Sequence, residues 1–251
     1  MTSLPREPGA RAGTVATLLR RAGYELRTLV AQYPAAAVPL ARLRGHGYPV
    51  GAETEVVIEG FPRSGTSFAV SAFEYPQVRK PVVAHHVHSP SQVIAAARRG
   101  LPALVLIRDP EDATLSLVIR TFELTIGQAL RGYVRFYRPL LPYRDRMVVA
   151  TFQQVTTDFG AVVRRMNARF GTAWRPFPHT DENVRGVLRA IDAYTRGTPE
   201  GAFERVVARP SAAREEPKRA LRDRYRAGRL RRVRERAEEL HASFVAAASG
   251  R

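Results

Sequence analysis

Arginine and histidine side chains follow three predicted strands, and the first of these strands leads into a glycine-bounded loop. Val56-Val57-Ile58 is a β-branched run typical of a strand buried on both faces of a parallel sheet. Gly60 through Gly65 then form a tight turn, and Thr66 to Phe73 begin a helix. Such a turn directs backbone N–H groups and the positive end of the helix dipole toward one point. The stretch therefore predicts an anion site suited to phosphate or sulfate.

The two glycines of this loop have the spacing of the ATP- and GTP-binding P-loop, Gly-x-x-x-x-Gly-Lys-Ser/Thr, but Thr66 stands at the lysine position. A nucleoside triphosphatase needs that lysine at the β- and γ-phosphates. Here the cation lies inside the loop, at Arg63. A P-loop kinase or NTPase that has lost its lysine remains an alternative.

Three histidines follow the strand predicted at 81–84 and precede a helix predicted at 91–99: His85, His86 and His88. Histidine titrates near neutral pH and can accept the proton of a reacting hydroxyl. Metal binding is an alternative, but the chain has no cysteine and no nearby carboxylate at a matching spacing. We expect no metal, and a purely structural role for the three rings stays open.

The third strand, predicted at 103–107, ends in Arg108-Asp109-Pro110, and Ser116 lies eight residues after the arginine. A guanidinium just before a helix N-terminus can hold a phosphate through two hydrogen bonds, and Ser116 would offer its hydroxyl to the same anion. Ligands of open parallel sheets bind beyond the carboxyl ends of the strands. Asp109 is better explained as a helix N-cap than as a magnesium ligand, because an arginine adjoins it.

Two motifs together resemble those of a known family. Pro62-Arg63-Ser64-Gly65-Thr66-Ser67 resembles the 5′-phosphosulfate loop of sulfotransferases, and Arg108-Asp109-Pro110 with Ser116 resembles their 3′-phosphate motif. On this basis the chain is similar to the P-loop sulfotransferase superfamily, bacterial type, over about residues 55–116. The resemblance implies an enzyme that transfers a sulfuryl group from 3′-phosphoadenosine 5′-phosphosulfate to a hydroxyl or amine, without a metal.

The resemblance also implies roles for single residues. Arg63 and the amides of Ser64, Gly65, Thr66 and Ser67 would bind and stabilise the departing 5′-phosphate, and Arg108 and Ser116 would hold the 3′-phosphate. His88-Ser89-Pro90 matches the His-x-Pro of many cytosolic members, so His88 is the first candidate base, His86 the second and His85 the third.

The chain departs from the family at two places. Gln153 and Gln154 stand where the family usually has an acidic residue. The late Arg-Lys-Gly cofactor motif is missing, and Arg209-Pro210-Ser211 with Arg214 and Lys218 is roughly placed to substitute for it.

Strands that alternate with helices predict an α/β protein, a three-layer P-loop fold with a central parallel sheet and helices on both faces. We expect a mobile N-terminus at 1–13. Residues 14–251 would form one domain with an Arg-rich C-terminal helical segment at about 212–247.

Helical spacing over 14–32 predicts an amphipathic helix that caps the domain, with peripheral membrane contact through Arg20, Arg21 and Arg27 as the alternative. Residues 34–52 would be an irregular approach to the first strand.

The composition limits the remaining possibilities. A net charge of +17 fits an anionic substrate or surface and also permits nucleic-acid binding. Aromatic residues are not interleaved with the arginines of 219–240, so we expect no nucleic acid, although a non-catalytic nucleotide- or nucleic-acid-binding module remains an alternative.

No apolar run suits a membrane-spanning helix and no secretory signal is evident, so we expect a cytoplasmic protein. The acceptor could be a small molecule, a carbohydrate or a lipid, and the sequence does not indicate the oligomeric state.

Overall fold

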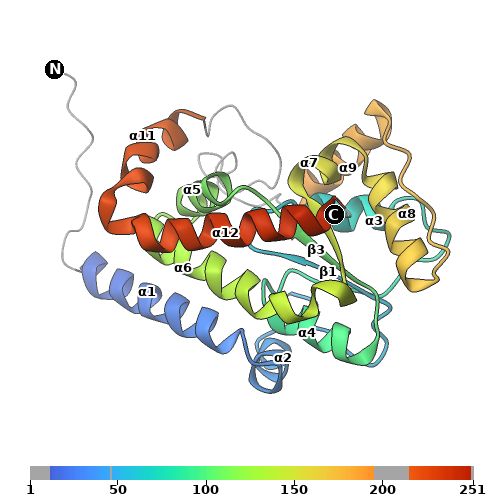
Figure 1. Cartoon of the computed structure of the whole chain (residues 1–251), viewed down its shortest axis with the longest axis horizontal. Coiled ribbons are helices and arrows are strands. Elements are labelled where there is room, and N and C mark those ends of the chain that lie inside the picture. The colour runs from blue at the N-terminus through green and yellow to red at the C-terminus, as the bar shows by residue number, and fades with distance from the viewer. Residues whose placement is uncertain (1–11, 46, 195–214, 250–251) are drawn as a thin grey trace.

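Four parallel strands form the centre of the protein. The computed structural model describes residues 12–45, 47–194 and 215–249. The strands are β1 (Val56–Gly60), β2 (Val83–His85), β3 (Ala103–Ile107) and β4 (Val148–Thr151), in the spatial order β2-β1-β3-β4. All three pairings are parallel. The predicted α/β fold with a central parallel sheet is confirmed (Figure 1).

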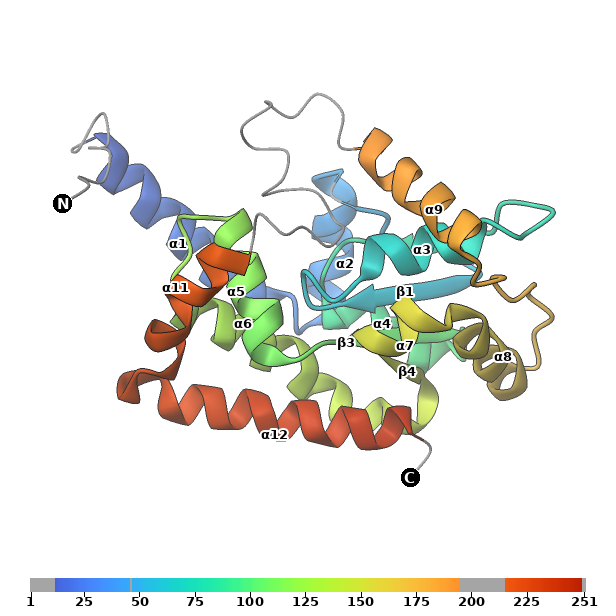
Figure 2. The same ribbon diagram turned by 90° about the horizontal axis from the view of Figure 1, so that it is seen from above.

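Both faces of the sheet are buried, which explains why its strands are continuous apolar runs. Along β3, Leu104 and Leu106 face one hydrophobic core, whereas Val105 and Ile107 face the other. Figure 2 shows the resulting layers. Helices α3 (Thr66–Glu74), α8 (Phe159–Phe170) and α9 (Asp181–Tyr194) cover one face, and α4 (Pro90–Arg99), α6 (Ile126–Tyr137) and α12 (Arg231–Ala248) cover the other.

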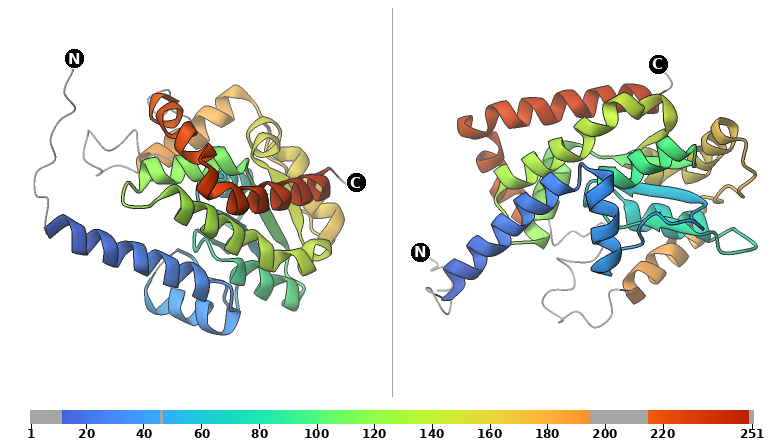
Figure 3. Two further views of the ribbon diagram at one scale, coloured as in Figure 1. Left: turned by 60° about the vertical axis from the view of Figure 1, so that its left-hand side comes forward. Right: turned by 90° about the horizontal axis from the view of Figure 1, so that it is seen from below.

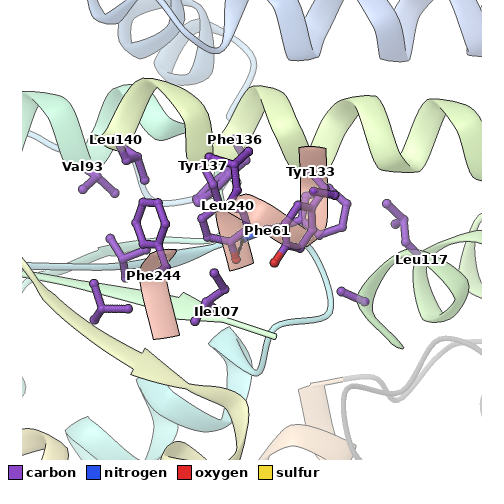
Figure 4. Close-up of a cluster of buried hydrophobic side chains, with 14 of the residues drawn as sticks. Phe61, Val93, Ile107, Leu117, Tyr133, Phe136, Tyr137, Leu140, Leu240 and Phe244 are labelled. Carbon is purple, nitrogen blue, oxygen red and sulfur yellow. Dashed lines mark hydrogen bonds between the residues drawn. The ribbon is translucent and has the colours of Figure 1, made fainter. Parts of the chain in front are cut away.

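The core between β3, α6 and α12 is rich in aromatic residues (Figure 4). Phe61, from the loop after β1, packs edge-on against Tyr133, and Tyr137 packs edge-on against Phe244 of α12. All four rings are almost fully buried. This core therefore connects the C-terminal helix to the loop that follows β1.

Helix caps fix the segments that follow the strands. Asp109 begins α5 (Pro110–Arg120), where its carboxylate accepts a hydrogen bond from the amide of Asp112 at 3.0 Å. Ser89 caps α4, with Pro90 at the first helical position. Both are ordinary N-terminal helix signals, and the predicted cap role of Asp109 is confirmed.

One prediction was wrong, and two further regions are divided into separate helices. The stretch 34–52 contains α2 (Pro34–Leu43), which begins at a proline and buries Ala37 and Ala41. Residues 152–170 form two helices, α7 (Phe152–Thr157) and α8, because Asp158 ends the first and caps the second. Helix α6 ends at Tyr137, where a 3-10 helix, η1 (Arg138–Arg146), begins with Pro139 near its start.

The C-terminal segment is also divided. Two helices, α11 (Glu215–Arg226) and α12, are joined by a single 3-10 turn, η3 (Gly228–Leu230). Residues 212–214 of the predicted segment and residues 1–11 of the predicted mobile N-terminus lie outside the described residues. Within 12–45, 47–194 and 215–249, no helix is long and apolar enough to cross a membrane.

Helix α1 (Ala12–Val30) packs on the domain through a largely polar face. Tyr24 is its buried anchor, and it reaches α6 at Gly132, where an added Cβ would lie 2.1 Å from the Tyr24 hydroxyl oxygen. Polar residues surround Tyr24 on this inner face, whereas the leucines of α1 are exposed. The helix expected over 14–32 is present, and its leucine face does not pack on the domain.

Candidate anion-binding and catalytic site

The loop after β1 has the compact geometry that its two glycines predict. A Cβ at Gly60 would lie 2.9 Å from the carbonyl oxygen of Leu106 on β3, so no side chain fits there. Gly65 has φ +95°, a left-handed conformation that favours glycine, and a Cβ there would lie 3.2 Å from the ring of Phe152. Helix α3 begins directly afterwards at Thr66. The loop therefore places the N-terminus of α3 at the carboxyl edge of the sheet.

The predicted cationic residues from the two loops meet at this edge. The Nε of Arg63 donates a hydrogen bond to the Ser116 hydroxyl at 3.0 Å, and an Nη of Arg108 donates to the Arg63 carbonyl at 3.1 Å. Arg63 itself has φ +72°, uncommon for a residue with a side chain. Ser116 is 53 residues from Arg63 in the sequence and is buried. The structure thus brings Arg63, Arg108 and Ser116 into one cluster.

Besides the Arg63 carbonyl, two side chains hold Arg108. Its guanidinium lies 4.2 Å from the ring centroid of Phe152 and 3.2 Å from a carboxylate oxygen of Asp112, one turn into α5. Lys218 of α11 contacts the same carboxylate at 3.4 Å. Burial disfavours the ionised form of Asp112, but Arg108 and Lys218 outweigh this effect and lower its pKa. The guanidinium group of Arg108 is therefore oriented before any ligand binds, which reduces the conformational entropy lost on binding.

Two buried polar atoms at this edge are suited to an anionic ligand. The Thr66 hydroxyl and the Nε of Arg108 are both buried, and neither has a hydrogen-bond partner among the described residues. Buried donors without partners are costly, so such atoms are expected where a ligand completes the site. Together with two guanidinium groups and a helix N-terminus, they fit a phosphate or sulfate group.

Tyr137 supports the loop after β1 through the hydrogen bonds of its hydroxyl group. Its hydroxyl donates to the Leu106 carbonyl at 2.7 Å, accepts from the Phe61 amide at 3.4 Å and lies 3.4 Å from the Ser64 hydroxyl. Burial raises the pKa of Tyr137 above its ordinary value, so the hydroxyl keeps its proton as a donor. No local pattern indicated this residue, because 73 positions separate it from Ser64.

The histidine segment lies beside the same loop. His86 and His88 have φ angles of +59° and +52°, so the backbone turns sharply there. The Nε2 of His86 lies 3.0 Å from the hydroxyl of Ser67, the last residue of the predicted anion loop. The Nδ1 of His88 lies 2.9 Å from the Gly60 carbonyl oxygen. Because a carbonyl only accepts, Nδ1 must carry the proton, which assigns the lone pair of the neutral ring to Nε2.

His85 has a different environment. Its backbone pairs with Tyr48 through two hydrogen bonds of 2.9 and 3.0 Å, and its ring lies 4.3 Å from the Tyr48 ring. Its Nδ1 also contacts the Nδ1 of His86. Burial, the neighbouring His86 and Lys80 together lower the pKa of His85 to about 3, so the ring is neutral. His85, the third candidate base, therefore helps to orient the ring of His86.

Glu59 is a buried carboxyl group that the sequence analysis did not assign. It accepts hydrogen bonds from the amides of Val87 at 2.9 Å and His88 at 3.2 Å, and from the side chain of Gln92 at 2.8 Å. Burial raises the pKa of Glu59 to about 7, against the opposing effect of these donors. A charged residue within an otherwise apolar strand is the signal that could have identified it. Glu59 holds the backbone that carries His88.

The structure describes three of the residues at which the chain departs from the sulfotransferase motifs: Gln153, Gln154 and Lys218. Gln154 caps α7 through reciprocal bonds with Thr151, and Gln153 is exposed. Arg209-Pro210-Ser211 and Arg214 lie outside the described residues. Lys218, which we grouped with them, contacts Asp112. In the part of the chain that the structure describes, no group of three or more His, Asp or Glu side chains is arranged to hold a metal ion.

The chain was compared with known proteins. No family model matches it. No curated protein matches it either. Among solved structures it is similar to mouse sulfotransferase SULT7A1 complexed with PAP, with a TM-score of 0.42 and 11% sequence identity. The alignment covers 78% of this chain and 92% of the mouse protein. This similarity is distant and does not assign a function to the chain.

Proposed function

We propose that this protein is a sulfotransferase that moves a sulfuryl group from 3′-phosphoadenosine 5′-phosphosulfate to a hydroxyl or amine of an acceptor. The observation that carries this proposal is the cluster of Arg63, Ser116 and Arg108 at the N-terminus of α3, in a loop that lacks the P-loop lysine. The donor has phosphates at two ends of an adenosine and no triphosphate. Two cationic groups from separate strand ends suit such a ligand better than they suit Mg–ATP.

The anion loop would act on the leaving group. When the donor is bound, it supplies a sulfuryl group whose bond to the 5′-phosphate oxygen breaks as the acceptor oxygen bonds to sulfur. Negative charge then develops on that phosphate oxygen. Arg63 and the amides of Ser64 to Ser67 would stabilise this charge, and fixed donors favour the transition state because they need no reorganisation. Arg108 and Ser116 would hold the 3′-phosphate.

The histidine segment would act on the acceptor. His88 has the tautomer that a general base needs, because its Nδ1 proton is committed to the Gly60 carbonyl and its Nε2 carries the lone pair. The proton of the acceptor hydroxyl would move to that nitrogen. His86 is the second candidate, and its contact with Ser67 connects the histidine segment to the anion loop. The class of acceptor (small molecule, carbohydrate or lipid) stays open in this proposal.

Thermal unfolding with nucleotides tests the donor. Adenosine 3′,5′-bisphosphate without metal is expected to raise the melting temperature, and adenosine 5′-monophosphate, which lacks the 3′-phosphate, is expected to raise it less. Stabilisation by Mg–ATP alone would indicate a kinase or NTPase instead. Salt-sensitive DNA binding without a response to either nucleotide would indicate a nucleic-acid-binding module. Transfer of labelled sulfate to a panel of acceptors would then identify the substrate.

A further inference from the structure

Helix α1 presents a continuous apolar stripe to solvent. Val15, Leu18, Leu19, Ala22, Leu26 and Leu29 recur at helical spacing and fall within an arc of about 100° on a wheel of 3.6 residues per turn. The five large side chains among them are 44 to 67% exposed. The stripe extends for about 21 Å at 1.5 Å per residue. An isolated exposed leucine needs no explanation, but a full helix face of them indicates an interaction surface.

The opposite face of α1 explains why the stripe points outward. Glu25 pairs with Arg131 and Arg135 of α6, and Thr28 accepts from Arg135 at 2.9 Å. Arg20 contacts the side chain of Glu123, and Arg21 contacts the carbonyl oxygen of the same residue. These polar contacts and buried Tyr24 fix the rotation of the helix about its axis. Consequently the apolar residues, which would normally face a core, lie on the outside.

The shape and charge of this region indicate what covers the stripe. Helix α1 forms an outer edge of the molecule (Figure 3), so the stripe is a ridge and not a groove. Residues 12–45 contain five arginines and one glutamate, a net charge of +4, within a chain of net charge +17. Two copies with this charge would repel one another if their ridges met. An anionic surface would instead attract the same residues.

We propose that α1 lies on an anionic lipid surface, with its leucine stripe inserted among the lipid chains and its flanking arginines at the headgroups. Arg27 and Arg20 are both exposed, although Arg20 also pairs with Glu123, and they lie on the flank between the stripe and the domain. A long side chain at this position reaches phosphate groups beside an inserted helix. From the sequence, peripheral membrane contact through Arg20, Arg21 and Arg27 was an alternative, and the present proposal adds the apolar face of the same helix to that contact. The inference does not depend on the proposed sulfotransferase activity.

Vesicle sedimentation of the full chain tests this proposal. The wild-type protein is expected to bind vesicles of phosphatidylcholine and phosphatidylglycerol, and to bind phosphatidylcholine vesicles weakly. Leu19→Gln/Leu26→Gln is expected to lower the affinity for the mixed vesicles by about tenfold or more. Val78→Gln is the matched control, because Val78 is 83% exposed and its loop between α3 and β2 lies at the opposite end of the molecule from α1 (Figure 2).

Three results would overturn the proposal. The first is equal binding of the wild type to both kinds of vesicle, and the second is unchanged binding by the double variant. The third is a wild-type dimer that the double variant converts into a monomer, since a second copy would then cover the stripe. Both leucines are exposed, so the melting temperatures of variant and wild type should agree, and agreement confirms that the variant is folded.

Fluorescence gives an independent measurement, because the chain has no cysteine. Leu26→Cys and Val78→Cys each create a single site for a polarity-sensitive dye. Mixed vesicles are expected to shift the emission of the dye at position 26 to shorter wavelength and to leave the dye at position 78 unchanged. Equal shifts at the two positions, or no shift at position 26, would contradict insertion of the stripe.

Discussion

The buried carboxyl group of Glu59 predicts a specific dependence of stability on pH. Its pKa is about 7 in the folded protein, where the side chain is fully buried, against 4.5 for an ordinary glutamate. Between these two values the folded protein binds a proton that the unfolded chain has released. Stability therefore falls as pH rises from 4.5 to 7 and then levels off. A difference of this size in pKa corresponds to about 3 kcal/mol of unfolding free energy.

Glu59→Gln removes this titration and keeps the shape of the side chain. Its amide oxygen can still accept from the Val87 amide and from Gln92, which make the shorter contacts to Glu59. The nearest titratable ring is that of His88, whose Nδ1 lies 3.8 Å from the carboxylate. We expect the stability of the variant relative to the wild type to increase by about 3 kcal/mol between pH 4.5 and 7.5. Urea unfolding at several pH values measures this difference.

Glu55→Gln is the matched control. The hydrogen bonds from Arg79 lower the pKa of Glu55 to about 2, with a contribution from the Val82 amide and against a small effect of burial. Its contribution to stability is therefore present above pH 4.5 and is lost as pH falls toward 2. The Glu55 variant should differ from the wild type by a constant amount between pH 4.5 and 7.5. If the curves of the Glu59 variant and the wild type are also parallel over this range, the argument from burial is wrong.

Three further substitutions, with a fourth as a control, test the site and the attachment of α1. Arg108→Ala is expected to weaken the binding of adenosine 3′,5′-bisphosphate roughly 10- to 100-fold, the effect of losing charge-assisted hydrogen bonds, as measured by calorimetry. His88→Ala should leave that affinity within about twofold and lower turnover by about 100-fold or more in a transfer assay; full activity would assign the base to His86 or to no histidine. Gly132→Ala should destabilise the protein by about 1–3 kcal/mol and increase hydrogen exchange in α1, because the new methyl group would collide with Tyr24. Gly23→Ala in the same helix meets no atom within 4 Å and should stabilise the protein slightly.

Local patterns in the sequence were sufficient for the sheet and the anion loop. Short apolar runs predicted the strands at 56–58 and 103–107, and Asp109 predicted the start of a helix. The spacing of Gly60 and Gly65 predicted a turn whose two glycine positions exclude a side chain. Each of these features depends on residues within one strand, turn or helical turn, so neighbouring residues determine it. Parallel strands end at one edge, which is why Arg63 and Arg108 could be expected to meet.

Contacts between distant segments were decided only by the tertiary structure. The tautomer of His88 depends on the Gly60 carbonyl, and the support of the anion loop depends on Tyr137, far along the chain. The stripe on α1 is visible in the sequence, but its direction is set by the pairing of Glu25 with two arginines of α6 more than 100 residues away. Periodicity shows that a helix has two unlike faces, and only the residues packed against it determine which face is buried.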